Sequence, residues 1–192
     1  MIEDLRQSPL HPSLLDGPHH KGVEHRTRAV TIRALGPRRF FALRARDPAP
    51  LAASLRERWP VELPCSPNRS AFFPGGMVVW WSPDEWLLSL DDPGISPRLA
   101  PRLGGAHVVD LTGGLVAVEV AGPDPRALLG AGCWLDFHPR AFHTGDAAQT
   151  LLAKANVTVV MTNDAPVYEV VVRRSFAPYL WRWLCHAADV VV

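Results

Sequence analysis

Cysteine and lysine are scarce in this chain, and both shortages exclude classes of protein. The 192 residues include three cysteines, Cys65, Cys133 and Cys185, which lie far apart and form no Cys-x-x-Cys pair. An odd, scattered set of this kind argues against a disulfide framework and against a zinc knuckle. Lys21 and Lys154 are the only lysines, and the 20 basic residues are balanced by 19 acidic ones. Without a clustered basic excess, nucleic acids and anionic membranes are not expected partners.

Long apolar runs are also missing. No stretch approaches the ~20 apolar residues of a membrane-spanning helix, although hydrophobic residues make up 47% of the chain. The opening sequence Met1-Ile-Glu-Asp-Leu-Arg is acidic and lacks the apolar segment of a secretory signal. The sequence therefore predicts a soluble, cytoplasmic protein with enough apolar residues to bury a core.

Glycine-rich cofactor loops are absent. The segment Gly130-Ala-Gly-Cys-Trp-Leu135 lacks the third glycine of a dinucleotide-binding loop and follows a helical pattern, so we expect it to end a helix. No Walker A loop and no nucleophile elbow occur. The acidic pairs Asp84-Glu85 and Asp91-Asp92 fall in turns, where aspartate bonds the backbone. We therefore expect no catalytic and no cofactor-binding residue on this chain.

One cluster contains metal-binding residue types without a known ligand spacing. Cys133, Asp136, His138 and His143 are side chains of the kind that bind zinc at ~2.0–2.3 Å. Their spacings of three, two and five residues fit no common motif. A buried cysteine among surface histidines explains the same residues, and we expect this chain to bind no metal.

The rest of the pattern predicts an α+β fold with mostly antiparallel sheets and a few helices. Residues 1–28 carry four histidines and little periodicity, which indicates an extended arm. Asp47-Pro48 and Asp124-Pro125 are expected to open helices, and Ser175 to cap a closing helix. Alternating apolar residues predict strands at 29–35, 39–43, 77–81, 86–90, 107–111, 115–120, 150–155, 157–162 and 167–173.

The order strand–strand–helix–strand–strand occurs twice. It predicts a single domain over residues 29–192 with two similar halves, about 29–105 and 106–192. Within the first half, residues 39–43 are expected to return antiparallel to residues 29–35. An irregular connection is expected over residues 93–105.

Tryptophan is abundant, and four of the seven tryptophans form two clusters. Adjacent strand residues point to opposite faces, so Trp80 and Trp81 cannot share one core. In the closing helix, Trp183 lies on the main apolar stripe, whereas Trp181 widens the apolar arc to roughly 200°, against the ~100° that a surface helix needs. Because aromatic residues are enriched at interfaces, Trp181 and one of Trp80 and Trp81 are predicted to contact a partner subunit. A helix buried entirely within its own domain is the alternative.

Several motifs in the same order resemble the gamma subunit family of heterotetrameric sarcosine oxidase. Trp80-Trp-Ser-Pro-Asp-Glu-Trp-Leu-Leu88 looks like the family's Gly-Pro-Asp-Glu-Trp-Leu signature, with Ser82 in the place of glycine. Further resembling segments are 109–114, 118–124, 133–142 and 174–184. Together the motifs extend over about residues 29–188.

The resemblance implies a fold similar to the folate-binding domain of glycine-cleavage aminomethyltransferases. It implies a non-catalytic, structural gamma-type subunit that contacts alpha, beta and delta subunits, chiefly the alpha subunit. Such a complex oxidatively demethylates sarcosine or a related N-methyl amino acid. The family's FAD, FMN, NAD and tetrahydrofolate belong to the larger subunits and its zinc to the delta subunit, so none is expected on this chain.

Two alternatives stay open. The chain could be a free-standing folate-binding or one-carbon-transfer protein, in which case Asp110 is the acidic residue to bind the pterin. However, Asp110 could equally bond its own Asp-Leu-Thr-Gly-Gly turn. A homo-oligomeric scaffold is the other alternative, and it explains the tryptophans but not the ordered motifs.

Overall fold

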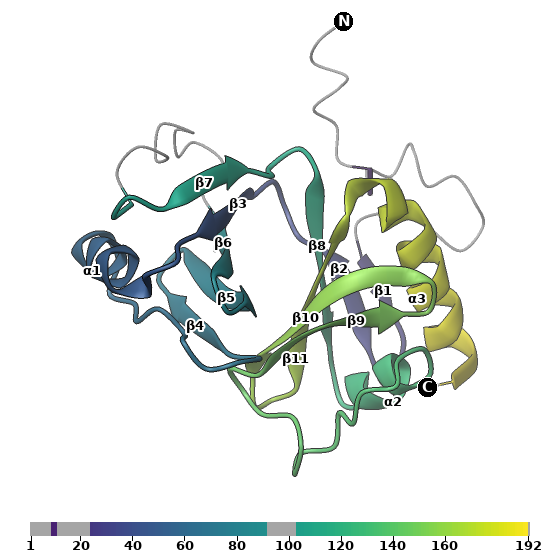
Figure 1. Cartoon of the computed structure of the whole chain (residues 1–192). Helices are drawn as coiled ribbons and strands as arrows, with labels where there is room; N and C mark the ends of the chain where they lie inside the picture. The colour runs from purple at the N-terminus through teal and green to yellow at the C-terminus, as the bar shows by residue number, and fades with distance from the viewer. Residues whose placement is uncertain (1–8, 11–23, 92–102, 192) are drawn as a thin grey trace, which may run out of the picture. The chain divides into compact units, whose positions relative to one another are not determined.

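The computed structural model describes residues 9–10, 24–91 and 103–191, whose strands form two sheets (Figure 1). Sheet A has the strand order β1 (Glu24–Arg26), β2 (Thr31–Ala34), β8 (Leu115–Ala121), β11 (Val167–Arg173), β10 (Ala155–Asn163) and β9 (Ala147–Leu152). Sheet B has the order β4 (Ser70–Phe73), β5 (Gly76–Ser82), β6 (Glu85–Leu90), β3 (Arg39–Arg44) and β7 (His107–Asp110). The helices are α1 (Pro48–Arg58), α2 (Pro125–Gly130), the 3-10 helix η4 (Arg174–Phe176) and α3 (Ala177–Val191). The predicted α+β class is confirmed.

Each half of the chain contributes one strand to the sheet of the other half. Sheet B contains β3 to β6 from the first half and β7 from the second. Sheet A contains β8 to β11 from the second half and β2 from the first, with β1 beside it. The order β4-β5-β6-β3-β7 therefore corresponds, position for position, to β9-β10-β11-β8-β2. The internal duplication predicted from the sequence is confirmed, but each half has the order strand–strand–helix–strand–strand–strand, one strand longer than predicted.

The strand exchange makes the two compact units of the chain discontinuous. Unit 1 contains the chain up to Gly36, Gly113–Thr144 and the residues from Gln149 onward. Unit 2 contains Pro37–Thr112 and Gly145–Ala148. The single domain over residues 29–192 stays a prediction.

The predicted helix starts are confirmed at both Asp-Pro pairs. Asp47 accepts a hydrogen bond from the Ala49 N–H at 3.0 Å, and Asp124 accepts one from the Ala127 N–H at 3.2 Å. In each case proline occupies the first helical turn, where a backbone N–H would have no partner within the helix, so its absence costs no hydrogen bond. These bonds join residues two or three apart, which is why the sequence alone reveals them.

The predicted pairing of residues 39–43 with residues 29–35 is wrong. β3 pairs with β6 and β7 in sheet B, whereas β2 pairs with β1 and β8 in sheet A. Phe40 and Phe41, on opposite faces of β3, are 2% and 1% exposed. β3 lies inside sheet B between β6 and β7, and both of these strands are far from it in sequence.

Two boundaries in the second half also differ from the prediction. The strand expected over 150–155 is interrupted because Ala153 has a φ of 53°, which turns the chain between β9 and β10. Ser175 does not cap the closing helix but lies inside η4, and α3 begins after it at Ala177. Instead of a side-chain cap, the backbone carbonyl of Arg174 accepts a hydrogen bond from the Ala177 N–H. Most of the connection expected at 93–105 lies outside the described residues.

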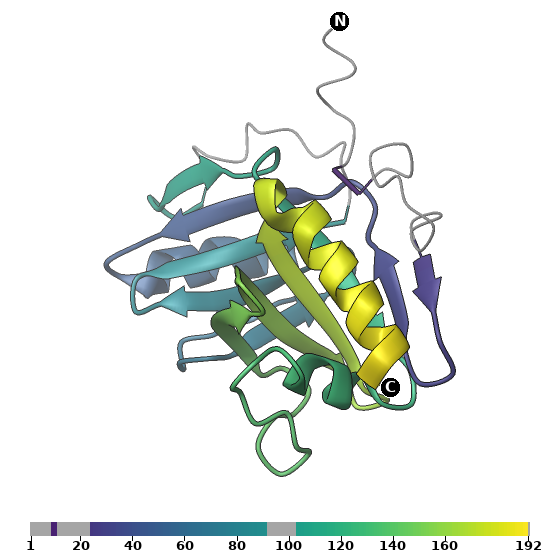
Figure 2. The ribbon, with the colours of Figure 1, turned by 90° about the vertical axis from the view of Figure 1, so that its right-hand side faces the viewer.

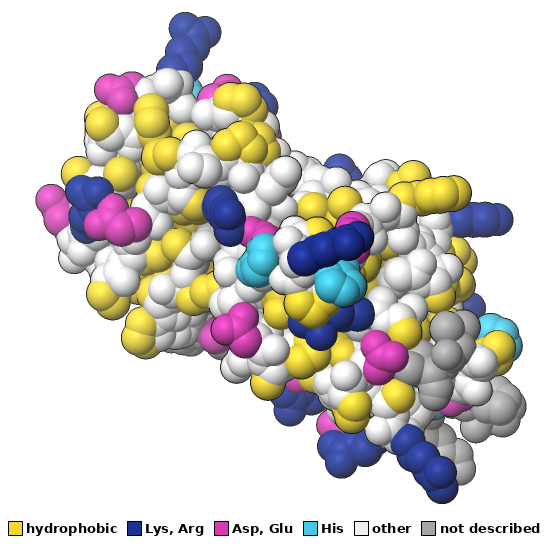
Figure 3. All heavy atoms as spheres, turned by 90° about the horizontal axis from the view of Figure 1, so that it is seen from below, with side chains coloured by type: hydrophobic (Ala, Val, Ile, Leu, Met, Phe, Trp, Pro, Cys, Tyr) yellow, Lys and Arg dark blue, Asp and Glu magenta, His cyan; other side chains and the backbone are white. Residues whose placement is uncertain are grey.

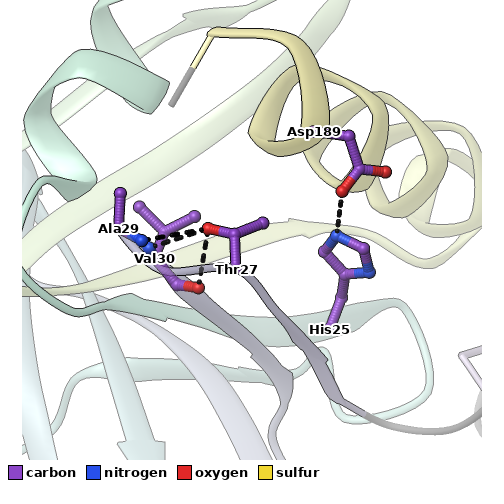
Figure 4. A network of polar contacts seen from close by, with 5 residues as sticks. All are labelled: His25, Thr27, Ala29, Val30 and Asp189. Atoms are coloured by element: carbon purple, nitrogen blue, oxygen red, sulfur yellow. Dashed lines mark hydrogen bonds and ion pairs between the residues drawn. The ribbon is translucent and has the colours of Figure 1, made fainter.

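The end of the predicted N-terminal arm is paired with sheet A, while most of residues 1–23 lie outside the described ranges. Thr27 makes the turn from β1 to β2, because its hydroxyl accepts hydrogen bonds from the N–H groups of Ala29 and Val30 (Figure 4). On the other side of this turn, His25 Nε2 lies 2.9 Å from Asp189 Oδ1 on α3. The arm's last residues therefore contact the far end of the chain.

Helix α3 lies across one face of sheet A (Figure 2). Its residues Leu180, Leu184 and Cys185 are each 0% exposed and belong to the core of unit 1. In unit 2, Leu51 and Leu55 of α1 are buried in a cluster with strands of sheet B. Over the described part of the chain, no helix combines the length and the apolar character that a membrane span requires.

Candidate functional site

Trp181, predicted to contact a partner, is instead part of the core of unit 1. Its side chain is 1% exposed, whereas Trp183, predicted to be core, is half-buried. The Trp183 ring lies so close to Gly132 that a Cβ there would approach Trp183 Cη2 to 2.3 Å. The wide apolar arc of α3 is thus covered within the chain at Trp181. The assignment of Trp181 to a partner interface is therefore wrong.

Trp80 and Trp81 on β5 are both half-buried. Trp80 is paired with Trp86 across the hairpin and packs against the core cluster of unit 2. Trp81 lies where the register of the hairpin shifts, and it is not among the residues of that cluster. A partner contact by one of these two residues stays a prediction.

Trp134, which sequence reasoning missed as a site residue, is fully exposed. Its relative accessibility is 102%, against 1% for Trp86 and Trp181. It lies in the segment 131–146, which joins α2 to β9 and will be called the 131–146 loop. The loop has neither strand nor helix periodicity, so no pattern assigned the side chain to a face. The one available signal was its place in the resembling segment 133–142.

Two buried phenylalanines fix the 131–146 loop on unit 1. Phe137 and Phe142 are 4% and 7% exposed, and their ring centroids are 5.4 Å apart. Phe137 also meets Tyr168 of β11 edge to face, at 5.6 Å and 84°. Aromatic pairs of this geometry contribute ~0.5–1.5 kcal/mol beyond the area that they bury. The loop is therefore anchored to sheet A by these buried aromatic rings, while Trp134 and most of its polar side chains are exposed.

The residues considered as metal ligands are bonded within this loop. Asp136 Oδ1 accepts a hydrogen bond from the His138 N–H at 2.9 Å, and His138 Nδ1 accepts one from the Arg140 N–H at 3.2 Å. Cys133 is buried, with Sγ 3.5 Å from Thr150 Oγ1. The described residues contain no group of three or more His, Cys, Asp or Glu side chains placed to hold a metal ion. His143 is exposed, and the cluster's geometry is that of a stabilised turn.

Asp110, the residue considered for pterin binding, stabilises its own turn. Its Oδ1 accepts a hydrogen bond from the Thr112 N–H at 2.9 Å, and its Oδ2 lies 3.8 Å from Arg39 Nη1. The turn-forming role that the sequence left open is thus observed. The carboxylate has a structural use that requires no ligand.

A hollow of about 580 Å³ in unit 2 has a mixed polar lining. Arg44 on its wall lies 3.7 Å from Asp84 and 3.4 Å from Glu85, so its charge is compensated. The lining also includes Arg46 and His107. It holds no serine, cysteine or lysine that could act as a nucleophile beside the histidine.

Two buried titratable groups of unit 1, Cys185 and Tyr168, have raised pKa values. Burial, with a further contribution from Asp189, raises the pKa of Cys185 to about 12. Burial also raises the pKa of Tyr168, and nearby Arg126 opposes this shift. A nucleophilic thiol needs a lowered pKa, so Cys185 is a core residue rather than a reactive one.

Comparisons with known proteins identify the same family along most of the chain. The family model described as "Sarcosine oxidase, gamma subunit family" (SoxG) matches residues 43–190. The sarcosine oxidase subunit gamma of Corynebacterium sp. strain U-96 is 30% identical over 167 residues, 83% of this chain and 80% of the relative. The subunit gamma of an Arthrobacter species is 34% identical over 116 residues, which cover 59% of this chain and 57% of the relative.

Two solved structures share the fold. A chain of the heterotetrameric sarcosine oxidase from Corynebacterium sp. U-96, solved in complex with pyrrole 2-carboxylate, superposes with a TM-score of 0.79 and 28% identity. That match covers 96% of this chain and 95% of the other. The glycine cleavage system aminomethyltransferase T of Bartonella henselae matches with a TM-score of 0.60 and 13% identity over 81% of this chain and 45% of the enzyme. The second match shows the fold alone.

Proposed function

The chain belongs to the sarcosine oxidase gamma subunit family, and we propose that it is a non-catalytic, structural subunit of a heterotetrameric sarcosine-oxidase-like complex. The observation that carries this proposal is the match to a chain of such a complex over 96% of this chain and 95% of the other. Agreement over nearly the whole length supports a comparable place for this chain in an assembly of this kind. The bonded states of Asp110, Asp136 and His138 support the non-catalytic role, because each side chain serves its own turn.

The proposal extends to the partners and the chemistry of the complex. Its partners are alpha, beta and delta subunits, chiefly the alpha subunit, in the cytoplasm. The complex oxidatively demethylates sarcosine or a related N-methyl amino acid. FAD, FMN, NAD and tetrahydrofolate are carried by the larger subunits, and zinc by the delta subunit.

Co-expression tests the proposal directly. The tagged chain is produced with the alpha-, beta- and delta-type subunits of the same organism, and also alone. We expect all four chains to co-purify in equal amounts, with flavin absorbance in the complex and none in the isolated chain. A stoichiometric flavin band in the isolated chain, or a chain that purifies free of the other three, would contradict the proposal.

Folate binding separates this function from the one-carbon-transfer alternative. Because the Asp110 carboxylate is bonded to its own turn, we expect calorimetric titration of the isolated chain with tetrahydrofolate to show no binding at micromolar concentrations. Saturable binding that is lost in Asp110→Ala would instead support a folate-binding protein. Asp136→Ala is the matched control, since it removes a turn aspartate at a different site.

A further inference from the structure

The 131–146 loop exposes a large apolar side chain that the fold of unit 1 does not use. Trp134 is 102% exposed, and its neighbours on either side, Cys133 and Leu135, are buried and half-buried. Leaving an indole ring in water forgoes the ~1.5–3 kcal/mol that burying a large apolar side chain contributes. The indole ring of Trp134 therefore stays hydrated and contributes nothing to the core of unit 1.

The backbone around Trp134 is fixed on both sides. On one side the Gly132 carbonyl accepts a hydrogen bond from the Ala153 N–H at 2.8 Å. On the other side Phe137 is buried against Tyr168, and the His138 carbonyl accepts hydrogen bonds from Ala141 at 2.8 Å and Phe142 at 3.0 Å. A group held in place before binding loses less conformational entropy when it binds. The loop therefore presents the indole ring on a preorganised support.

The surroundings of Trp134 combine apolar and hydrogen-bond-donating groups. The contact between Cys133 and Thr150 brings the loop beside β9, where the next residue, Leu151, is 51% exposed. Arg140 is 77% exposed and has one ion pair, to Asp136 at 3.6 Å, among the contacts described. Figure 3 shows one face of the chain, on which histidine and basic side chains lie among hydrophobic ones. An aromatic centre with a polar rim is the composition of an interface hot spot.

We propose that Trp134 is the anchor by which this chain docks on another subunit of its complex, with the indole ring inserted into an apolar pocket of that subunit. The rim of that pocket offers hydrogen-bond acceptors, because the indole N–H and the Arg140 guanidinium are donors. Leu151 extends the apolar contact along β9. This inference rests on the proposed function and adds the surface through which the chain assembles.

The test measures the assembly of Trp134→Ala and Trp134→Phe with the other three subunits, beside the unchanged chain. We expect Trp134→Ala to weaken assembly by at least about thirtyfold, equivalent to ~2 kcal/mol at 1.4 kcal/mol per decade. Trp134→Phe, which retains a ring, should lose less. The melting temperature of the isolated variants should equal that of the unchanged chain, since the side chain is fully exposed. Phe176→Ala, which removes another exposed aromatic ring from unit 1, is the matched control and should assemble normally.

The possible outcomes separate the inference from the function on which it rests. If Trp134→Ala assembles as tightly as the unchanged chain, the docking inference is overturned and the proposed function stands. If the unchanged chain binds none of the three subunits, both are overturned. Sedimentation of the isolated chain detects a third case, a homodimer that Trp134→Ala dissociates, which would also overturn docking on a different subunit.

Discussion

At the residue scale, the tryptophans of unit 1 have opposite environments that composition does not reveal. Trp181 on α3 is 1% exposed, whereas Trp134 in the 131–146 loop is fully exposed to solvent. The indole N–H of Trp181 has no hydrogen-bond partner among the residues that the structure describes. Its contribution to stability is therefore apolar packing, reduced by one buried polar group without a partner.

Truncation of Trp181 is expected to destabilise the chain strongly. Trp181→Ala should lower the free energy of unfolding by ~3–5 kcal/mol, because it leaves a cavity in the core. Trp181→Phe should cost much less, since it keeps an aromatic ring and removes the unpaired N–H. Urea unfolding monitored by circular dichroism measures both variants against Trp134→Ala, for which no loss is expected. Equal stabilities of Trp181→Ala and Trp134→Ala would contradict this assignment.

The raised pKa of Cys185 makes the free energy of unfolding depend on pH in the alkaline range. Its pKa is raised from 9.0 to about 12, so the folded chain keeps a proton that the unfolded chain releases above pH 9. The stabilisation is therefore fully present below pH 9 and is lost as pH rises from 9 towards 12. We expect urea midpoints to fall over this range, and to fall less steeply in Cys185→Ala. Stability should still depend on pH to some extent in Cys185→Ala, because burial also raises the pKa of Tyr168.

At the element scale, the contact between α3 and the segment after α2 depends on a residue without a side chain. A Cβ on Gly132 would lie 2.3 Å from Trp183 Cη2 and 2.6 Å from Trp183 Cζ2. Distances this short require the ring to move. Glycine at this position therefore allows the helix and the loop to approach each other.

Gly132→Ala is expected to destabilise the chain by ~1–3 kcal/mol, the usual cost of adding atoms to a packed contact. In a Trp183→Ala background the same substitution should cost less, because the ring is gone and the remaining neighbour is Ala153 N at 3.2 Å. A double-mutant cycle by urea unfolding should give a coupling of ~0.5–3 kcal/mol. Additive effects of the two substitutions would show that the ring and Gly132 do not interact.

At the scale of the whole molecule, the exchange of strands ties the two halves of the chain together. β8 lies between β11 and β2, and β3 lies between β6 and β7. Each half alone would expose one edge of a strand that is central in the complete sheet. An unpaired edge of that kind leaves backbone groups without partners and promotes aggregation.

Fragments cut between residues 105 and 106 should therefore fold only together. We expect fragment 106–192 alone to lack a cooperative unfolding transition, and the mixed fragments to regain the circular dichroism spectrum of the whole chain. Fragment 37–192 is the control, because it keeps all five strands of sheet B and should retain part of the circular dichroism spectrum of the whole chain. Cooperative unfolding of fragment 106–192 alone would mean that β2 is dispensable for sheet A.

The sequence by itself determined the features that depend on near neighbours in the chain. Asp47 and Asp124 cap helices through bonds to residues two or three positions away, and the hairpin of β5 and β6 needs one short turn. The α+β class and the duplication follow from the order of such elements. The ordered motifs led to the family that the comparisons confirm.

Only the tertiary structure decided which residues are covered by distant parts of the chain. The partners of β3, the burial of Trp181 and the exposure of Trp134 all depend on contacts that join segments far apart in sequence. The periodicity of α3 gave the width of its apolar arc, but it carried no information on whether the covering surface is the chain's own sheet or another subunit. Burying an apolar side chain against any complementary surface removes the same area from water, so the pattern alone does not distinguish the two surfaces.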